Sequence, residues 1–222
     1  METKVLNIYF AGDLFDAKDL GGNLLLADAI EKVSAGRYHV LLPQDGECEI
    51  LERTSESIRD ADFELLFSAD VIVANFDGHE LDSGTVTEFC FAKMVDMPAV
   101  LLRTDFRDGG DHTLPDGEPW NLMCSHYPRT KTLHINVMER YHLCRTETSG
   151  RREQLERFYN SIASETIRAL DEVTALPSWL TKGELRGQYS AALKSIGGSL
   201  YKRFSPEKFL KLLAEKEASG LY

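Results

Sequence analysis

The chain has 222 residues, long enough to bury a sizeable core, and its 43% hydrophobic and 27% charged residues are ordinary for a globular protein. The formal net charge of −11 argues against a general nucleic-acid-binding surface, because neutralising phosphates requires clustered lysine and arginine. The four cysteines form no CxxC pair and have no metal-ligand spacing with histidine. We therefore expect free thiols and no metal site built on cysteine, and we expect no cofactor.

The first residues, METKVLNIYF, lack the charged segment and long apolar run of a signal peptide. No stretch approaches the roughly 20 apolar residues that a membrane helix needs. These features favour a cytoplasmic protein without a membrane partner, and a cleavable transit peptide outside this sequence stays open as an alternative.

Short apolar runs alternate with amphipathic segments through the first two thirds of the chain. In chain order we predict a strand at 5–11, a helix at 23–34, a strand at 39–42, an amphipathic segment at 50–67, a strand at 69–75, a helix at 85–95, and strands at 99–102 and 132–137. Strands that are apolar on both faces and alternate with helices indicate a parallel sheet that helices cover on both sides. The predicted fold class is therefore α/β, with a five-stranded parallel sheet.

The last third of the chain has a different character. Residues 151–173 show the charged amphipathic pattern of a helix, and one or two further helical segments follow residue 177. These segments carry no recognisable chemistry. We therefore divide the chain into an α/β domain at 1–146 and a C-terminal helical extension at 147–222.

Acidic residues gather after the third predicted strand, and in open parallel sheets the ligand crevice lies beyond the carboxyl ends of the strands. A loop there carries Asp77, Glu80 and Asp82, and the next helix carries Glu88 in its first turn. Clustered carboxylates raise some pKa values, whereas a helix N-terminus favours an ionised Glu88. Two carboxylates with opposite tendencies suit cleavage of a glycosidic bond, one as nucleophile and one as proton donor.

The same residues also fit structural roles. Thr85 and Glu88 have the spacing of a capping box, in which Glu88 bonds back to the start of its own helix. Asp82 fits an N-cap, and Asp77 begins an Asp-Gly turn. Asp77, Glu80 and Asp82 also have the oxygen ligands that Mg²⁺ or Ca²⁺ prefers. The pattern alone leaves these alternatives open.

Five segments, in order, resemble the nucleoside 2-deoxyribosyltransferase family across about residues 5–125. They are IYFAG at 8–12, ADVIVANFDG at 69–78, DSGTVTEFCFA at 82–92, DFR at 105–107 and NLM at 121–123. The resemblance implies a flavodoxin-like, Rossmann-like fold with the catalytic domain in residues 1–146. It also implies an enzyme that cleaves the N-glycosidic bond of 2-deoxyribonucleosides and transfers the sugar to another nucleobase.

The resemblance assigns three residues to the chemistry. It implies that Glu88 is the nucleophile, which forms a covalent deoxyribosyl ester that a second base or water resolves. Tyr9 matches the tyrosine that holds the nucleophile in place. Asp77 matches the carboxylate that contacts the base and supplies the proton of the leaving group.

Other positions match residues that surround the substrate. Asp82 matches a carboxylate that shapes the pocket, and Gly12 and Gly84 belong to the matching segments beside it. Asn121 and Met123 match residues that a neighbouring subunit places over the sugar. The resemblance therefore implies a homo-oligomer, with a dimer as the smallest complete enzyme.

The charge of Asp82 favours free nucleosides over nucleotides as substrates. A carboxylate about 4 Å from a 5′-phosphate is repelled by on the order of 4 kcal/mol at a near-surface dielectric. Arg103 and Arg107 keep the question open, because either could approach a phosphate, although solvated surface arginine is the commoner role.

Two other functions remain as alternatives. One is an N-glycoside hydrolase with the same nucleophile, which the sequence does not separate from a transferase. The other is a non-catalytic nucleoside- or nucleotide-binding module. A dinucleotide site is not expected, since no GxGxxG follows the first strand.

Overall fold

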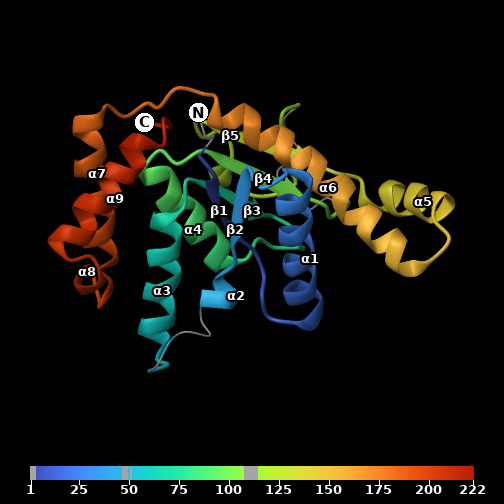
Figure 1. Cartoon of the computed structure of the whole chain (residues 1–222), viewed down its shortest axis with the longest axis horizontal. Coiled ribbons are helices and arrows are strands. Elements are labelled where there is room, and N and C mark those ends of the chain that lie inside the picture. The colour runs from blue at the N-terminus through green and yellow to red at the C-terminus, as the bar shows by residue number, and fades with distance from the viewer. Residues whose placement is uncertain (1–3, 47–49, 51, 108–114) are drawn as a thin grey trace.

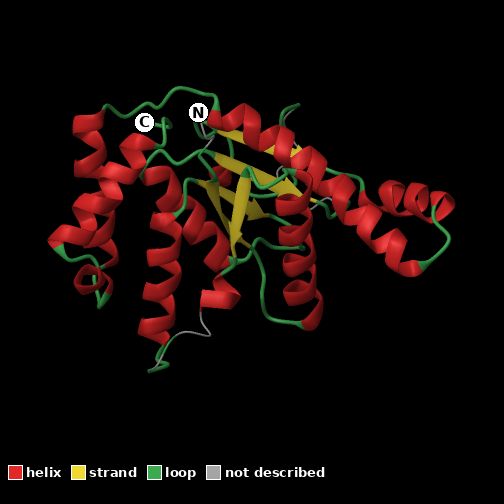
Figure 2. Ribbon diagram, in the orientation of Figure 1, coloured by secondary structure: helices red, strands yellow, loops and turns green. Residues whose placement is uncertain are grey.

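The computed structural model describes residues 4–46, 50, 52–107 and 115–222. These residues form one sheet whose five strands are β1 (Leu6–Ala11), β2 (Tyr38–Leu41), β3 (Val71–Asn75), β4 (Ala99–Arg103) and β5 (Thr130–His134). All neighbouring strands are parallel, in the order β2-β1-β3-β4-β5 (Figure 2). The predicted α/β fold with a five-stranded parallel sheet is confirmed, and its strand order is that of flavodoxin-like proteins.

Helices cover both faces of this sheet (Figure 1). One face is covered by α1 (Ala17–Val33) and α6 (Arg151–Thr174), and the other by α3 (Ser55–Ser68) and α4 (Ser83–Met94). The remaining described helices are α2 (Pro43–Gly46), α5 (Val137–Glu147), α7 (Lys182–Ile196), α8 (Leu200–Arg203) and α9 (Pro206–Ala218), with a 3₁₀ turn, η2, at Leu122–Cys124. Within the described ranges, no helix combines the length and apolar character needed to cross a membrane.

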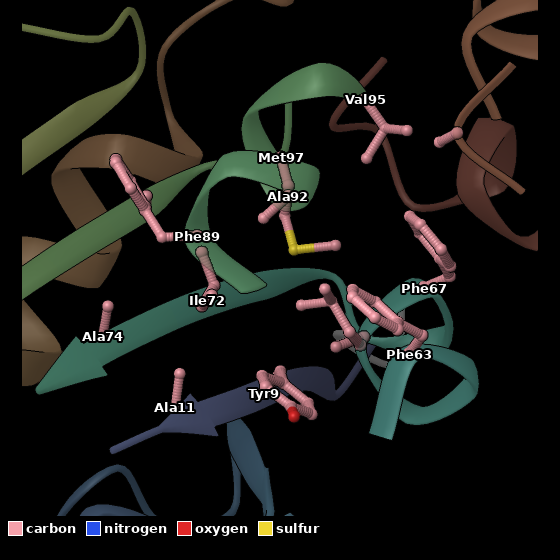
Figure 3. Close-up of a cluster of buried hydrophobic side chains, with 14 of the residues drawn as sticks. Tyr9, Ala11, Phe63, Phe67, Ile72, Ala74, Phe89, Ala92, Val95 and Met97 are labelled. Carbon is pink, nitrogen blue, oxygen red and sulfur yellow. The ribbon is translucent and has the colours of Figure 1, made fainter. Parts of the chain in front are cut away.

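The alternation of side chains along β1 divides the core into two parts. Ile8 and Phe10 pack with the apolar residues of α1 and α6. Tyr9 and Ala11 point to the opposite face, into the cluster built from α3, α4 and the C-terminal helices (Figure 3). The Tyr9 ring is consequently buried in the core that also supports α4.

Several helical segments differ from the sequence prediction. Helix α2 was not predicted, and three described helices, rather than one or two, follow residue 177. Helix α1 begins at Ala17 rather than at residue 23, because Asp16 caps it by accepting hydrogen bonds from the backbone N–H groups of Lys18 and Asp19. Helix α5 was not predicted. It extends beyond the edge of the sheet with Tyr141 and Leu143 exposed (Figure 1), so it lacks the buried apolar stripe that reveals a helix in a sequence.

Helix α6 is part of the sandwich itself. Its apolar residues Ile162, Ala163, Ile167 and Leu170 are buried in the same core cluster as β1, β3 and β4. The division of the chain into a domain at 1–146 and an extension at 147–222 stays a prediction. Wherever the boundary lies, α6 covers one face of the sheet.

Lys216 anchors α9 to the core. Its side chain is 1% exposed, and its ammonium donates to the carbonyl oxygens of Ser68, at 2.9 Å, and of Ala69. Asp70 lies 3.7 Å from the same nitrogen. Lys216 therefore binds the last carbonyls of α3 and a buried carboxylate at the start of β3.

Replacement of Lys216 tests how firmly the last helix is bound. We expect Lys216→Met to lower the free energy of unfolding by about 3 kcal/mol, because it leaves a buried carboxylate and two carbonyls short of a partner. Lys211→Met, at an exposed position of the same helix, is the control and should change it by less than about 0.5 kcal/mol. Urea denaturation followed by circular dichroism measures both; equal effects would contradict the anchoring role.

Candidate active site

The candidate site lies where the carboxyl ends of β1 and β3 meet. Strand β1 lies between β2 and β3, so the chain connections leave it in opposite directions at this point, which is where open α/β sheets bind ligands. A side chain at Gly12 would place its Cβ 3.2 Å from Cβ of Asn75, closer than an ordinary contact. Glycine at position 12 therefore lets the two strand ends approach each other.

Tyr9 and Glu88 meet at this edge. The phenol of Tyr9, which is fully buried, donates a hydrogen bond of 2.6 Å to Oε1 of Glu88 on α4. Position 9 faces α4 because alternate residues of β1 face opposite sides of the sheet. The structure thus brings together the two residues that the sequence suggested as nucleophile and holder.

Asp82, and not Glu88, caps α4. Oδ2 of Asp82 accepts hydrogen bonds from the backbone N–H of Thr85, at 2.7 Å, and from its hydroxyl, at 2.9 Å. A side chain at Gly84 would place its Cβ 3.0 Å from this oxygen, so glycine leaves room for the cap. The capping-box alternative for Glu88 is wrong, since α4 begins at Ser83 and Glu88 lies in its second turn.

The surroundings of Glu88 favour its protonated form. Burial raises the pKa of Glu88 to about 8, the hydrogen bond from Tyr9 opposes this, and the charges of Asp62 and Asp82 add to the rise. The expectation that the helix N-terminus keeps Glu88 ionised is wrong, because that effect fades beyond the first turn. The pKa of Tyr9 is also raised, by burial and by the neighbouring charges of Glu88 and Asp62.

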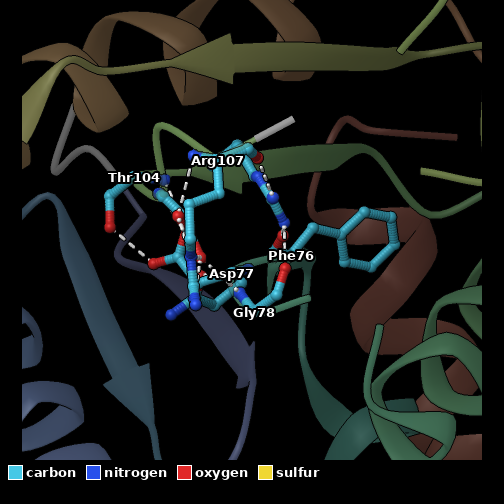
Figure 4. A network of polar contacts seen from close by, with 8 residues as sticks. Phe76, Asp77, Gly78, Thr104 and Arg107 are labelled. Carbon is cyan, nitrogen blue, oxygen red and sulfur yellow. Dashed lines mark hydrogen bonds and ion pairs between the residues drawn. The ribbon is translucent and has the colours of Figure 1, made fainter. Parts of the chain in front are cut away.

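The carboxylate of Asp77 accepts three hydrogen bonds from the segment that follows β4 (Figure 4). Its Oδ1 accepts from the backbone N–H groups of Thr104, at 2.5 Å, and of Asp105, at 2.7 Å. Its Oδ2 accepts from the hydroxyl of Thr104. Asp77 is therefore held in place by the neighbouring strand end.

Arg103 is a buried structural residue. It is 2% exposed, and its guanidinium donates to the carbonyls of Phe76, of Gly78, at 2.9 Å, and of Arg107, at 2.8 Å. The suggestions that Arg103 approaches a phosphate or is solvated are wrong, because these carbonyls and burial leave it no such freedom. Arg107 forms an ion pair with Asp105, which holds the pKa of that carboxyl well below its usual range.

Among the described residues, no hydrogen bond links Asn121 or Met123 to Glu88. Asn121 caps η2 by accepting from the backbone N–H of Met123, at 3.0 Å. The side chain of Met123 is 70% exposed. The neighbouring Trp120 ring is buried, with its centre 5.1 Å from that of Phe76. The segment is thus anchored while Met123 remains accessible to another molecule.

A cavity of about 580 Å³ opens beside Asp77, between α1 and α6. Asp13, Asn75 and Thr104 also line it, whereas Tyr9 and Glu88 lie on the other side of the sheet. Among the described residues, no three His, Cys, Asp or Glu side chains are grouped as a metal would require. The oxygens of Asp77 and Asp82 are instead used by local hydrogen bonds.

The sequence analysis missed three residues of this site. Asp13 ends the β1 segment, and burial, followed by the charges of Asp82 and other carboxylates, raises its pKa. Its position at a strand end was a usable signal, as was that of Thr104 after β4. Asp62 lies within an amphipathic helix, where nothing in the sequence distinguishes it from a solvated residue.

The raised pKa of Glu88 makes stability depend on pH. Because the pKa of about 8 exceeds the ordinary value of 4.5, the folded protein binds more protons than the unfolded chain between these values. The contribution of protonated Glu88 to stability is fully present below pH 4.5 and is lost as the pH rises towards about 8.

We therefore expect the wild type to lose stability relative to Glu88→Gln as the pH rises from about 5 to about 8, by at most roughly 1.4 kcal/mol per pH unit. Urea denaturation at several pH values measures the difference. In Tyr9→Phe, which lacks the bond that lowers the pKa of Glu88, the loss should continue to higher pH. Parallel curves for wild type and Glu88→Gln would contradict the raised pKa.

Comparisons with known proteins identify the family of the chain. The sequence profile described as nucleoside 2-deoxyribosyltransferase matches residues 8–123, which is more than half of the chain. A solved structure of a conserved protein from Enterococcus faecalis V583 is 26% identical, with a TM-score of 0.50, over 60% of this chain and 92% of that one. Among curated proteins the chain has no match.

Two further solved structures are more distant. A 2-deoxyribosyltransferase from Bacillus psychrosaccharolyticus is 19% identical, with a TM-score of 0.40, over 47% of this chain and 77% of that one. A 2-desoxiribosyltransferase from Leishmania mexicana is 20% identical, with a TM-score of 0.43, over 55% and 86%. The profile match covers most of β1, all of β2, β3 and β4, the Tyr9–Glu88 pair and the Asp77 turn, and it ends before β5. The chain belongs to the nucleoside 2-deoxyribosyltransferase family.

Proposed function

We propose that this protein cleaves the N-glycosidic bond of 2-deoxyribonucleosides and transfers the sugar to another nucleobase, with Glu88 as the nucleophile. The observation that carries the proposal is the 2.6 Å hydrogen bond from Tyr9 to Glu88 at the carboxyl edge of the sheet. Membership of the family gives the general class of reaction on small nucleosides. The hydrogen bond supports Glu88 as the carboxylate that attacks the sugar.

The proposed reaction has two displacements at the anomeric carbon. In the first, an oxygen of ionised Glu88 forms a bond to that carbon while the bond to the base breaks, and the leaving base takes its proton from the protonated carboxyl of Asp77. In the second, a nitrogen of the incoming base forms a bond to that carbon, the bond to Glu88 breaks, and the proton of this nitrogen returns to ionised Asp77. Two inversions give retention of configuration. Tyr9 holds Oε1, which directs the other oxygen towards the sugar.

Asp77 is the proposed contact for the base. An ionised carboxylate offers about four acceptor positions, and three are filled by Thr104 and Asp105. The remaining position, on Oδ2, accepts an N–H group of the base when Asp77 is ionised, and it carries the proton that the leaving base receives when Asp77 is protonated.

Residues 1–146 are the proposed catalytic domain, and the active unit is a homo-oligomer. The exposed Met123 and the adjacent Asn121 would lie over the sugar bound by a neighbouring subunit, with Asp82, Gly12 and Gly84 forming the near wall. The anchoring of Trp120 supports this, since it holds an otherwise exposed segment in one position.

Substitution of Glu88 tests the proposed chemistry. With a deoxynucleoside and a second base, the wild type should produce a new nucleoside, and Glu88→Ala should produce none while its circular dichroism spectrum stays unchanged. Mass spectrometry of the acid-quenched wild type should find one deoxyribosyl group on the peptide that contains Glu88. The exposed Glu80, in the preceding loop, provides the control variant Glu80→Gln, which should stay active.

Three outcomes separate the alternatives. Release of free deoxyribose with no new nucleoside would indicate the hydrolase. Binding of nucleoside without turnover would indicate the non-catalytic module. An active and folded Glu88→Ala variant would refute the assignment of the nucleophile.

Asp82 supports nucleosides rather than nucleotides as substrates. A phosphate binds well at a helix N-terminus, but at α4 the carboxylate of Asp82 already occupies this position. We expect a deoxynucleoside 5′-monophosphate to have a kcat/KM at least about tenfold below that of the free nucleoside, because the two negative charges repel each other. Asp82→Asn should reduce the ratio of kcat/KM for the nucleoside to kcat/KM for its monophosphate, and Glu80→Gln should not. Equal ratios in all three proteins would contradict the role of Asp82.

A further inference from the structure

The turn that carries Asp77 is held by the strand beside it. Strands β3 and β4 run in parallel with Asn75 opposite Leu102, and the backbone N–H of Phe76 donates to the carbonyl of Leu102, at 2.8 Å. The two segments therefore leave the sheet side by side. Residues just after β4 can consequently reach the side chain of Asp77.

The hydroxyl of Thr104 limits which part of Asp77 is free. Backbone N–H groups fill both positions of Oδ1, so only Oδ2 can contact a ligand. The Thr104 hydroxyl occupies one of the two positions of Oδ2 and leaves the other. One threonine thus fixes the direction from which a base can approach the carboxylate.

The backbone around Asp77 is fixed as well (Figure 4). Buried Arg103 donates to the carbonyls of Phe76 and Gly78, the residues on either side of Asp77. Gly78 has a φ of +102°, which few other residues adopt, and its N–H donates to Asp105, at 3.3 Å. Neither the carboxylate nor its turn can shift without breaking these bonds.

We infer that Thr104 is a positioning residue, which orients Oδ2 of Asp77 towards the base, on the turn that Arg103 fixes. This inference rests on the proposed role of Asp77. A correctly oriented contact matters most when the bond to the base is breaking, since small misplacements cost rate. Loss of the hydroxyl should therefore affect kcat more than KM.

The experiment compares Thr104→Val, which removes the hydroxyl at nearly constant shape, with Thr104→Ser, which keeps it. For cleavage of a deoxynucleoside, we expect Thr104→Val to lower kcat roughly tenfold, the value of one lost hydrogen bond, and Thr104→Ser to stay within about threefold of the wild type. Thr130→Val is the control, because this half-buried threonine on β5 donates its hydroxyl to the carbonyl of Pro128, at 3.0 Å. Its kcat should equal that of the wild type.

A second background shows whether Thr104 acts through Asp77. In Asp77→Ala, addition of Thr104→Val should change the residual kcat by less than about twofold, because the group it orients is gone. A full tenfold loss in that background, or wild-type kinetics of Thr104→Val alone, would overturn the inference and leave the proposed function standing. A wild type that cleaves no deoxynucleoside would overturn both.

Discussion

A short hydrogen bond between a buried phenol and a carboxylate is the interaction on which the candidate site depends. Tyr9 can make it only because it faces α4 from β1, and Glu88 because it lies in the second turn of that helix. Both groups are raised in pKa by burial, so each is costly to ionise on its own. The bond from Tyr9 partly offsets this cost for the carboxylate form of Glu88. The strand order and the start of α4 thus determine the chemistry available at this edge.

The acidic groups of the site have separate tasks, which their hydrogen bonds distinguish. Asp82 is committed to the start of α4, and Asp77 to the segment after β4. Glu88 accepts a hydrogen bond from the side chain of Tyr9 through Oε1. Such a division explains how several carboxylates share one strand edge without forming a metal-binding group in the described part of the chain. Burial, followed by repulsion from neighbouring carboxylates, raises the pKa values of Glu88 and Asp13.

The sequence predicted the sheet well because its strands are apolar on both faces, a pattern that few other structures produce. Glu88, Tyr9 and Asp77 came from segments that resemble the family, and the structure places Tyr9 and Glu88 in contact. The sequence predicted an ionised Glu88, whereas burial raises its pKa. Burial depends on packing between segments that are distant in the sequence, so the sequence pattern does not reveal it. Arg103 was misread for the same reason: one arginine at a strand end gives no indication that three carbonyls will surround it.

The C-terminal helices affect the site through α3. Lys216 binds the carbonyls at the end of this helix, and Ser199 donates from its N–H to Glu56, at 2.9 Å, near its start. Gly198, just before the second contact, has a φ of +63°, which favours glycine. Between these two attachments α3 carries Asp62, whose charge raises the pKa of both Tyr9 and Glu88. The attachment of α3 at both ends fixes the position of this charge relative to Glu88. The last part of the chain therefore contributes to the electrostatics of the site from the far side of α3.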